Sequence, residues 1–392
     1  MITGRAIFLM RLHAFAKPVK IAIGACLLIA LVGPAHGLIK FNDGHDELFV
    51  TGTAGMGYDT NIYAGANSVG DTTTTATVDL DYQRKAGLLG VNGNLGWKFG
   101  WFADHNSENY VDPHAHAEIT KGGGRTTGSL TLGAERQSRA EYALNLRTVS
   151  WDYNAGLNVK YPVIERYSIS GQLAYDYQDY LNNSGLFDIR SYTAGADLFY
   201  VYTSERDLIG GYRLRVTDTT NSTRSYDHAF TLGTTGKLLP KLNGTIRLGY
   251  QFRQTDRNNN GASDKFNAFT ASASTTWTVT RRLNITGVAS RDFTTLATDV
   301  NVDNTTVVVD ANFAATAKFA LFAGIGGGHL RYLGAASNGR EDTYFTAHAG
   351  LSYTMNDHLK VTLSGLYYKN WSKLNQADFV RRTISLIVSS RW

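Results

Sequence analysis

Apolar and polar residues alternate along almost the entire chain beyond residue 37, with the two-residue period of a β-strand. The clearest run is VSWDYNAGLNVKY at 149–161, in which every second residue is apolar. A second run, YSISGQLAYDY at 167–177, follows the same rule. No segment shows a convincing 3.6-residue period of an amphipathic helix. The pattern predicts an all-β chain.

The alternation predicts eighteen strands, with sixteen as the alternative count. The weakest is the fifteenth, because Gly324, Gly326, Gly327 and Gly328 obscure its phase and leave open which face Leu321 takes. The predicted ranges are 47–58, 73–83, 88–99, 113–120, 126–136, 148–160, 166–178, 190–202, 207–217, 226–236, 242–253, 266–279, 283–292, 305–317, 320–332, 343–354, 359–369 and 380–392.

The connections between these strands alternate in length. Residues 203–206 and 355–358 form short turns, whereas 59–71 and 100–112 form longer polar loops. A soluble β-sandwich has no reason to alternate in this way, but a membrane barrel with short periplasmic turns and long extracellular loops does. We therefore expect a transmembrane antiparallel up-and-down β-barrel.

Aromatic residues lie on the apolar phase near both ends of many strands. Amphipathic rings prefer the headgroup boundaries of a bilayer, so two aromatic girdles are expected. The alternative is that these rings lie at the edge of a sandwich core. The predicted membrane-interface aromatics are Trp97, Trp151, Tyr175, Tyr200, Tyr202, Tyr250, Trp277 and Trp392.

The first 37 residues have the features of a cleaved secretory signal peptide. Arg11, Lys17 and Lys20 precede the apolar run IAIGACLLIALV at 21–32, and small residues follow it. The alternative, a short membrane anchor, requires a longer apolar run. Residues 38–392 then form a single outer-membrane barrel domain. The only cysteine, Cys26, lies in the leader, so no disulfide framework is expected.

Composition removes two classes of function. The formal net charge of +5 derives largely from the leader, which holds four basic residues and no acidic one. The remainder is nearly neutral, so nucleic acid is not expected as a partner. No stretch after residue 37 approaches the roughly 20 apolar residues of a membrane helix.

The C-terminal segment adds an independent signal. Ile384, Leu386, Val388, Ser390 and Trp392 are spaced by two, and the chain stops on the aromatic. Here the chain resembles bacterial outer-membrane β-barrel proteins, although Ser390 departs from the usual apolar preference. The resemblance implies a Gram-negative outer membrane, contact with the lipid bilayer and lipopolysaccharide, and recognition of the last strand by the barrel-assembly machinery.

A narrower resemblance is carried by the six residues GYDTNI at 57–62, directly after the first predicted strand. They resemble the opening of the putative β-barrel porin 2 family. Members of that family often accompany exopolysaccharide export genes. The resemblance therefore implies periplasmic polysaccharide-export proteins as further partners.

The polar residues of the alternating strands are expected to line the lumen. Its many hydroxyls and amides could not all find partners in a dry core, so the interior is expected to be wet. A barrel of this strand number leaves room for an aqueous channel. The predicted channel-lining charges are Asp79, Asp81, Glu118, Asp152, Asp176, Asp197, Arg213, Arg215, Arg247 and Arg253.

These charges are unevenly distributed, with acids on the first eight strands and arginines on the ninth and eleventh. One hypothesis is a transverse field in which uncompensated arginines attract anionic solutes. The other is local pairing, for example of Asp197 with Arg213 across the turn between their strands.

A metal or catalytic site has little support. His114, His116 and Glu118 share one strand face, and His348 on another inward phase is a possible further ligand. Closed and catalytic metal sites need third and fourth ligands of known placement, so solvated lumen histidines are expected instead. We predict no metal, no cofactor and no enzymatic activity. The expected function is a porin-like channel for passive passage of hydrophilic solutes, serving exopolysaccharide export. The alternatives are a structural or adhesive barrel with a blocked lumen, or an outer-membrane enzyme.

Overall fold

The computed structural model describes residues 39–84, 87–181, 185–257, 263–334 and 337–392. The predicted signal peptide lies outside these residues. Two single-turn 3-10 helices, η1 (Asn106–Glu108) and η3 (Asn375–Ala377), lie in connections. The strands are β1 (Ile39–Phe41), β2 (Asp46–Asp59), β3 (Asp71–Arg84), β4 (Gly90–Phe102), β5 (Tyr110–Lys121), β6 (Thr127–Glu141), β7 (Leu146–Ile164), β8 (Tyr167–Leu181), β9 (Ile189–Thr203), β10 (Arg206–Thr219), β11 (Thr223–Leu239), β12 (Leu242–Arg257), β13 (Ser263–Thr278), β14 (Leu283–Thr295), β15 (Asn301–Ala314), β16 (Phe319–Tyr332), β17 (Glu341–Thr354), β18 (Leu359–Ser372) and β19 (Phe379–Arg391).

All eighteen predicted strands are present, as β2 to β19, and most extend a few residues beyond the predicted bounds. The additional strand β1 was not predicted. It has three residues, pairs with the start of β2 and is joined to it by a turn in which Asn42 and Asp43 have φ of 54° and 55°. Three residues are too short a run to show a two-residue period, which is why the pattern missed this strand.

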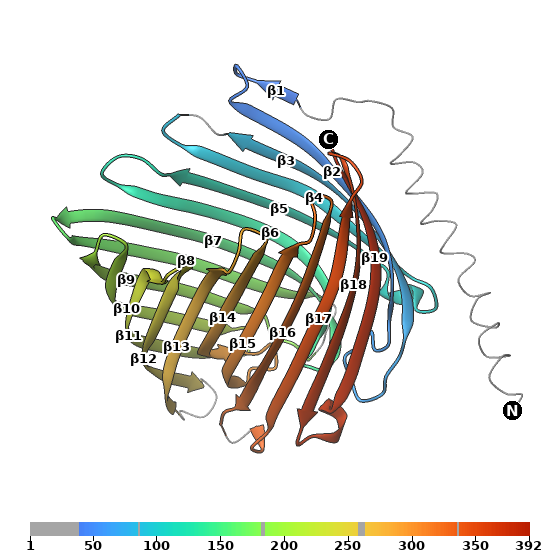
Figure 1. Cartoon of the computed structure of the whole chain (residues 1–392). Coiled ribbons are helices and arrows are strands. Elements are labelled where there is room, and N and C mark those ends of the chain that lie inside the picture. Colours follow the sequence, from blue (N-terminus) through green and yellow to red (C-terminus); the bar gives the residue numbers. More distant parts are fainter. Residues whose placement is uncertain (1–38, 85–86, 182–184, 258–262, 335–336) are drawn as a thin grey trace, which may run out of the picture.

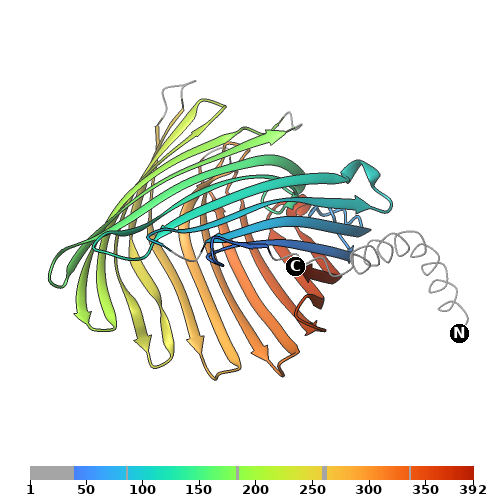
Figure 2. The same cartoon turned by 90° about the horizontal axis from the view of Figure 1, so that it is seen from above.

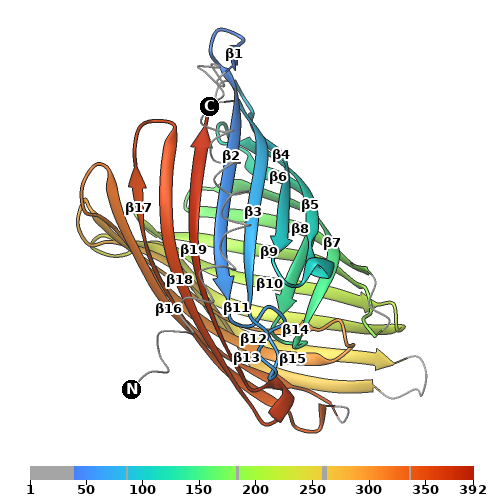
Figure 3. The ribbon, with the colours of Figure 1, turned by 90° about the vertical axis from the view of Figure 1, so that its right-hand side faces the viewer.

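The sheet closes into a barrel. Each strand from β2 to β18 pairs antiparallel with the next, and β19 pairs with β2 over Arg391↔Thr51 to Thr383↔Asp59. The backbone N–H and C=O of Trp392 extend this closure by bonding to Val50, at 2.9 Å each. Figure 1 shows the strands following one another in chain order, and Figure 3 shows β19 lying beside β2. Seen from above in Figure 2, the sheet curves round until its two ends meet.

The outer face carries the apolar phase. Leu157, Leu232 and Leu248 are 42%, 74% and 52% exposed, whereas Ser150 on the opposite phase is 1% exposed. A closed barrel with an apolar exterior satisfies every strand edge and suits a lipid environment. No helix among the described residues is long and apolar enough to cross a membrane.

The structure resolves the face of the fifteenth predicted strand, which is β16. Leu321 is exposed on the outer face and pairs with Phe313 and Leu351. Gly324 and Gly328 take the inward phase, because a Cβ there would lie 2.4 Å from the His348 ring and 2.5 Å from the Tyr344 ring. These glycines let rings from β17 lie flat over β16.

The connections follow the predicted alternation only loosely. At one end, residues 165–166, 204–205 and 240–241 form two-residue turns. At the other end the longest connection is 60–70, but 142–145 and 220–222 are nearly as short as turns. Here the strands themselves, rather than long loops, project beyond their neighbours.

The wall from β10 to β15 bends sharply. Strands β13 and β14 pair only over 271–278 and 284–291, so they separate toward the long-loop end. Arg213 on β10 contacts Asp292 on β14 at 2.8 Å, although four strand spacings of about 4.8 Å separate them along the sheet. An arginine side chain cannot span that distance over a flat sheet, so the barrel has a tight corner here.

Candidate functional site: the barrel lumen

The lumen-facing arginines at the tight corner all bind carboxylates. Arg247 donates two hydrogen bonds to Asp197, at 2.6 and 3.0 Å, and Arg213 donates to Asp292. Bidentate guanidinium–carboxylate pairs of this kind are among the stronger ion pairs in proteins. The positive charge of this wall is therefore largely compensated.

The centre of the corner is a buried network around Asp227. Arg253 donates two hydrogen bonds to Asp227, and Arg215 contacts the same carboxylate at 2.8 Å. The side chains of Arg253 and Asp227 are 1% and 0% exposed. Arg253 also donates to Asn301 at 2.9 Å and lies over the Phe293 ring at 5.3 Å.

Two expectations about these arginines are wrong. Asp197 does not lie opposite Arg213, since their strand register places Asp197 opposite Gly211 and Arg213 opposite Gly195. Nor does an uncompensated group of arginines remain, because Asp227 and Asp292 supply the missing acids. Asp227 lies directly opposite Arg215 and Arg253 on the two neighbouring strands. The contacts of Asp292 with Arg213 and Arg215 instead join strands four apart, so neighbouring-strand pairing does not reveal them.

The opposite wall, from β3 to β8, carries several carboxylates that form no ion pair with any described residue. Asp81 accepts hydrogen bonds from Thr51 at 2.9 Å and from Asn94 at 2.8 Å, and Glu118 accepts one from Asn92 at 3.5 Å. Within the described part of the chain neither acid forms an ion pair. Neutral donors orient a carboxylate without cancelling its charge.

Two further acids continue this wall. Asp152 accepts a hydrogen bond from Ser150 at 2.8 Å, and among the described residues neither it nor Asp176 forms an ion pair. Asp79 differs, since its carboxylate lies 2.8 Å from Nε2 of His114. We name Asp81, Glu118, Asp152 and Asp176 the acidic wall.

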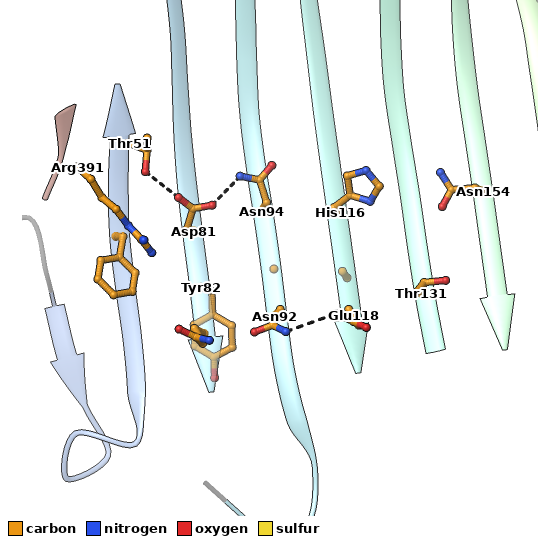
Figure 4. A pocket seen from close by; sticks show the side chains of 14 residues that line it. Thr51, Asp81, Tyr82, Asn92, Asn94, His116, Glu118, Thr131, Asn154 and Arg391 are labelled. Carbon is orange, nitrogen blue, oxygen red and sulfur yellow. Dashed lines mark hydrogen bonds between the residues drawn. The ribbon is translucent and has the colours of Figure 1, made fainter. Parts of the chain in front are cut away.

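A cavity of about 700 Å³ lies along the acidic wall, toward the end with the short turns. Figure 4 shows Asp81 between Thr51 and Asn94, with the Asn92–Glu118 pair and His116 on neighbouring strands. Most of the lining residues carry an amide, hydroxyl or carboxylate group, and Arg391 and His116 also line the cavity. Such a surface can exchange hydrogen bonds with water or with a hydrophilic solute.

The two histidines of β5 have different partners. His114 pairs with Asp79, while His116 lines the cavity. In the described ranges no three His, Cys, Asp or Glu side chains are grouped so that they could hold a metal ion.

At the long-loop end, the β6–β7 turn at 142–145 crosses to the far wall. The Tyr142 ring stacks on Tyr368 of β18 with centroids 4.2 Å apart and planes 14° apart, and its hydroxyl accepts a hydrogen bond from Arg381 at 2.8 Å. Burial raises the pKa of the Tyr142 hydroxyl above its ordinary value. The hydroxyl is therefore neutral at physiological pH.

Three more hydrogen bonds hold this turn. Tyr332 donates to the carbonyl of Ala143 at 3.2 Å, Arg340 donates to Oδ1 of Asn145 at 3.1 Å, and Nδ2 of Asn145 donates to the carbonyl of Ala64. The turn thus narrows the mouth of the lumen.

Two other connections also fold inward. Asn61 and Ile62, in the connection 60–70, are almost fully buried. Asp299, in the connection 296–300, accepts hydrogen bonds from Thr219 and Thr223 on the opposite side of the tight corner. Within the described part of the chain, these two connections and the turn 142–145 therefore all fold toward the lumen at this end.

The predicted interface aromatics lie on the outward phase or at the strand ends. Trp97, Tyr202 and Trp277 are exposed there, and Trp392 stacks on His358 with centroids 4.4 Å apart. Their position at a bilayer boundary stays a prediction. The others that share this assignment are Trp151, Tyr175, Tyr200 and Tyr250.

Sequence reasoning missed an aromatic and apolar group on the inner face of β15 to β18. Its main members are Leu330, Tyr344, Leu366 and Tyr368. The run Leu366-Tyr367-Tyr368, in which both phases are apolar, was the available signal. The alternation was used to find the outward-facing residues only, so apolar residues on the inward phase were not noticed.

Comparison with known proteins gives a family match over part of the chain. Residues 227–391 match the family described as "Putative beta-barrel porin 2". The chain resembles this porin family. The match confirms the predicted resemblance, although the motif at 57–62 that suggested it lies outside the matched residues. No curated protein matches the chain.

The solved structures that resemble this chain include three proteins of Pseudomonas aeruginosa. OccK2 (OpdF) is 12% identical, with 91% of this chain and 99% of that chain covered and a TM-score of 0.48. OpdO has the same identity and TM-score, covering 91% and 98%. OpdK, solved with vanillate, is 12% identical with 88% and 99% covered and a TM-score of 0.47.

The closed barrel, its apolar exterior and the family match place the chain in the outer membrane of a Gram-negative bacterium. It is a porin-like outer-membrane β-barrel.

Proposed function

We propose that the barrel is a non-enzymatic channel for passive passage of small hydrophilic solutes, and that it favours cations over anions. The observation that carries the proposal is the charge balance of the lumen. The arginines Arg213, Arg215, Arg247 and Arg253 all bind acids, whereas the acidic wall forms no ion pair among the described residues. Its cavity holds the carboxylates Asp81 and Glu118 against one guanidinium, that of Arg391, which lies over the Phe49 ring. An unpaired carboxylate facing a water-filled path attracts cations and repels anions.

The test is the reversal potential of the purified barrel in planar bilayers under a salt gradient. The wild type should show cation preference, most clearly at low salt, where the Debye length is about 30 Å at 0.01 M. The variant Asp81→Asn/Glu118→Gln/Asp152→Asn keeps shape and polarity while removing three charges. Its reversal potential should move toward the anion side.

Asp218→Asn is the matched control. Asp218 pairs with Arg224 at the long-loop end of β10, outside the acidic wall, so its loss should leave the reversal potential unchanged. The proposal fails if the wild type prefers anions, or if the triple variant and the wild type show the same potential.

A second candidate function is a structural barrel that conducts little. The observation in its favour is the turn 142–145, which crosses the mouth and contacts β18 and β19. Absence of conductance in bilayers, with the barrel correctly folded, would favour this candidate over the channel.

Export of an exopolysaccharide stays a prediction from the family resemblance, as do the partners that it implies. A polymer passing through the lumen would have to move past the turn 142–145. The test compares the release of a labelled polysaccharide by a strain that lacks this gene and by the same strain with the gene restored. Export through the barrel predicts less release from the deletion strain.

A further inference from the structure

A second cavity, of about 540 Å³, lies at the long-loop end of the lumen. Its walls are the turn 142–145 with the end of β6, the connection 296–300 with the end of β14, and inward positions of β15 to β18. We infer that this mouth cavity binds a small uncharged aromatic solute that carries hydroxyl groups. The inference rests on the proposed function, in that the bound solute is one that enters the channel.

The lining of the mouth cavity departs from the rest of the lumen. The inward positions of β7 hold residues such as Ser150 and Asn154, whereas Leu330, Leu366 and Val308 take inward positions here. These three side chains are only half-buried. Apolar surface left beside a wet lumen gains free energy when an apolar group covers it.

The shape of the apolar surface favours a flat ring. Tyr368 lies between Tyr142 and Tyr344, with ring centroids at 4.2 and 5.6 Å and planes within 15° of parallel. Aromatic rings at these separations attract one another beyond the area that they bury. A further ring can extend the stack along the wall, because Gly328 lets Tyr344 lie flat on β16.

The charges around the cavity favour an uncharged solute. Its two carboxylates already have guanidinium partners, since Glu141 accepts from Arg139 at 3.1 Å and Asp342 accepts from Arg340 at 3.1 Å. A charged solute would find no free opposite charge here. Its own charge would then be partly desolvated without a partner, which costs binding free energy.

The remaining polar groups suit hydroxyl substituents. Among the described residues, the Tyr368 hydroxyl, the Thr346 hydroxyl and Nδ2 of Asn304 form no hydrogen bond, and all three residues line the cavity. A cavity of about 150 Å³ already holds benzene. The mouth cavity is therefore large enough for one substituted ring and several waters.

The experiment is calorimetric titration of the detergent-purified barrel with 4-hydroxybenzyl alcohol. We expect saturable binding, and at least about tenfold weaker binding of the anion 4-hydroxybenzoate. Tyr142→Ala should weaken binding of the alcohol about tenfold. Tyr142→Leu keeps the bulk of the side chain, so a loss in both variants at unchanged heat-modifiable gel mobility assigns the effect to the ring.

Tyr63→Ala is the matched control. Tyr63 is a mouth tyrosine that bonds to Glu108 outside the cavity, so its loss should leave affinity unchanged. Equal affinity of the wild type and Tyr142→Ala overturns the inference. Tighter binding of 4-hydroxybenzoate or of methyl glucoside than of the alcohol also overturns it.

The calorimetric titration does not depend on conductance, so the channel proposal and the aromatic-site proposal can be rejected independently of each other. A barrel that conducts with cation preference but shows no heat of binding overturns only the aromatic site. A barrel that binds the alcohol but does not conduct overturns the channel and leaves the site.

Discussion

Arg253 and Asp227 are buried in the lumen wall although both carry a charge. The arrangement is stable because each of the three guanidinium nitrogens has an acceptor. Nε and Nη2 donate to Asp227, and Nη1 donates to Asn301 and to the carbonyl of Thr294. Desolvating two ions is costly, and close pairing with additional hydrogen bonds offsets that cost. Removing one partner leaves the other charge inadequately compensated.

Arg253→Met should therefore lower the free energy of unfolding by roughly 3 kcal/mol, the lower end of the range for breaking a buried pair, because Arg215 still contacts Asp227. Urea unfolding in detergent, followed by tryptophan fluorescence, measures the change. Arg224→Met breaks the exposed pair with Asp218 and should cost less than about 1 kcal/mol. Equal losses in the two variants would show that burial of the pair is unimportant.

The sequence indicated which charged residues share the inward phase but not which of them pair. Phase is a local property that the alternation along one strand reveals. The contact between Arg213 and Asp292 depends on the curvature of five strands, and that between Arg253 and Asn301 on the curvature of four. No spacing along the chain encodes that curvature.

At the scale of the strand, the local alternation of apolar and polar residues was sufficient to predict almost all of the strands. Every strand from β2 to β19 was predicted because each one has an apolar outer face and a contrasting inner face along most of its length. Two strands depart from this pattern: β1 was not predicted, and the faces of β16 were left open. β1 is too short for a period, and β16 has inward glycines that provide no contrast with its outer face.

The assigned faces predict opposite effects for adjacent residues of β7. Leu157 faces outward, so Leu157→Arg puts a guanidinium into the lipid and should cost about 2–4 kcal/mol if it lies near the midplane. Asn158 faces the lumen, and Asn158→Arg should assemble far better. Heat-modifiable gel mobility reports the folded fraction, and equal assembly of both variants would contradict the register.

At the scale of the whole molecule, the two ends of the lumen differ in character. The short-turn end holds the polar cavity along the acidic wall, and the long-loop end is narrowed by inward connections. The sequence predicted a wet lumen with long outer loops. It did not predict that the turn 142–145 reaches across the mouth, because its anchors Tyr368 and Arg381 lie more than 200 residues away.

Replacing residues 142–145 with the two-residue turn Asn-Gly removes the aromatic stack and the hydrogen bonds that cross the mouth. Single-channel conductance should then rise, by about twofold or more if the mouth dominates the resistance, because the narrowest part of the path widens. Tyr63→Ala serves again as the control. Unchanged conductance in the shortened barrel would place the main resistance elsewhere in the lumen.

The crossing turn also determines the order in which the barrel can be completed. Tyr142 lies on the third hairpin after β1, whereas Arg381 lies on the last strand, 239 residues later. The stack of Tyr142 on Tyr368 and its hydrogen bond from Arg381 need β18 and β19, so both form after these last two strands have entered the sheet. Contacts of such high sequence separation form late in folding. We therefore expect the turn 142–145 to lack its contacts with β18 and β19 in a newly inserted barrel, until these last two strands are in place.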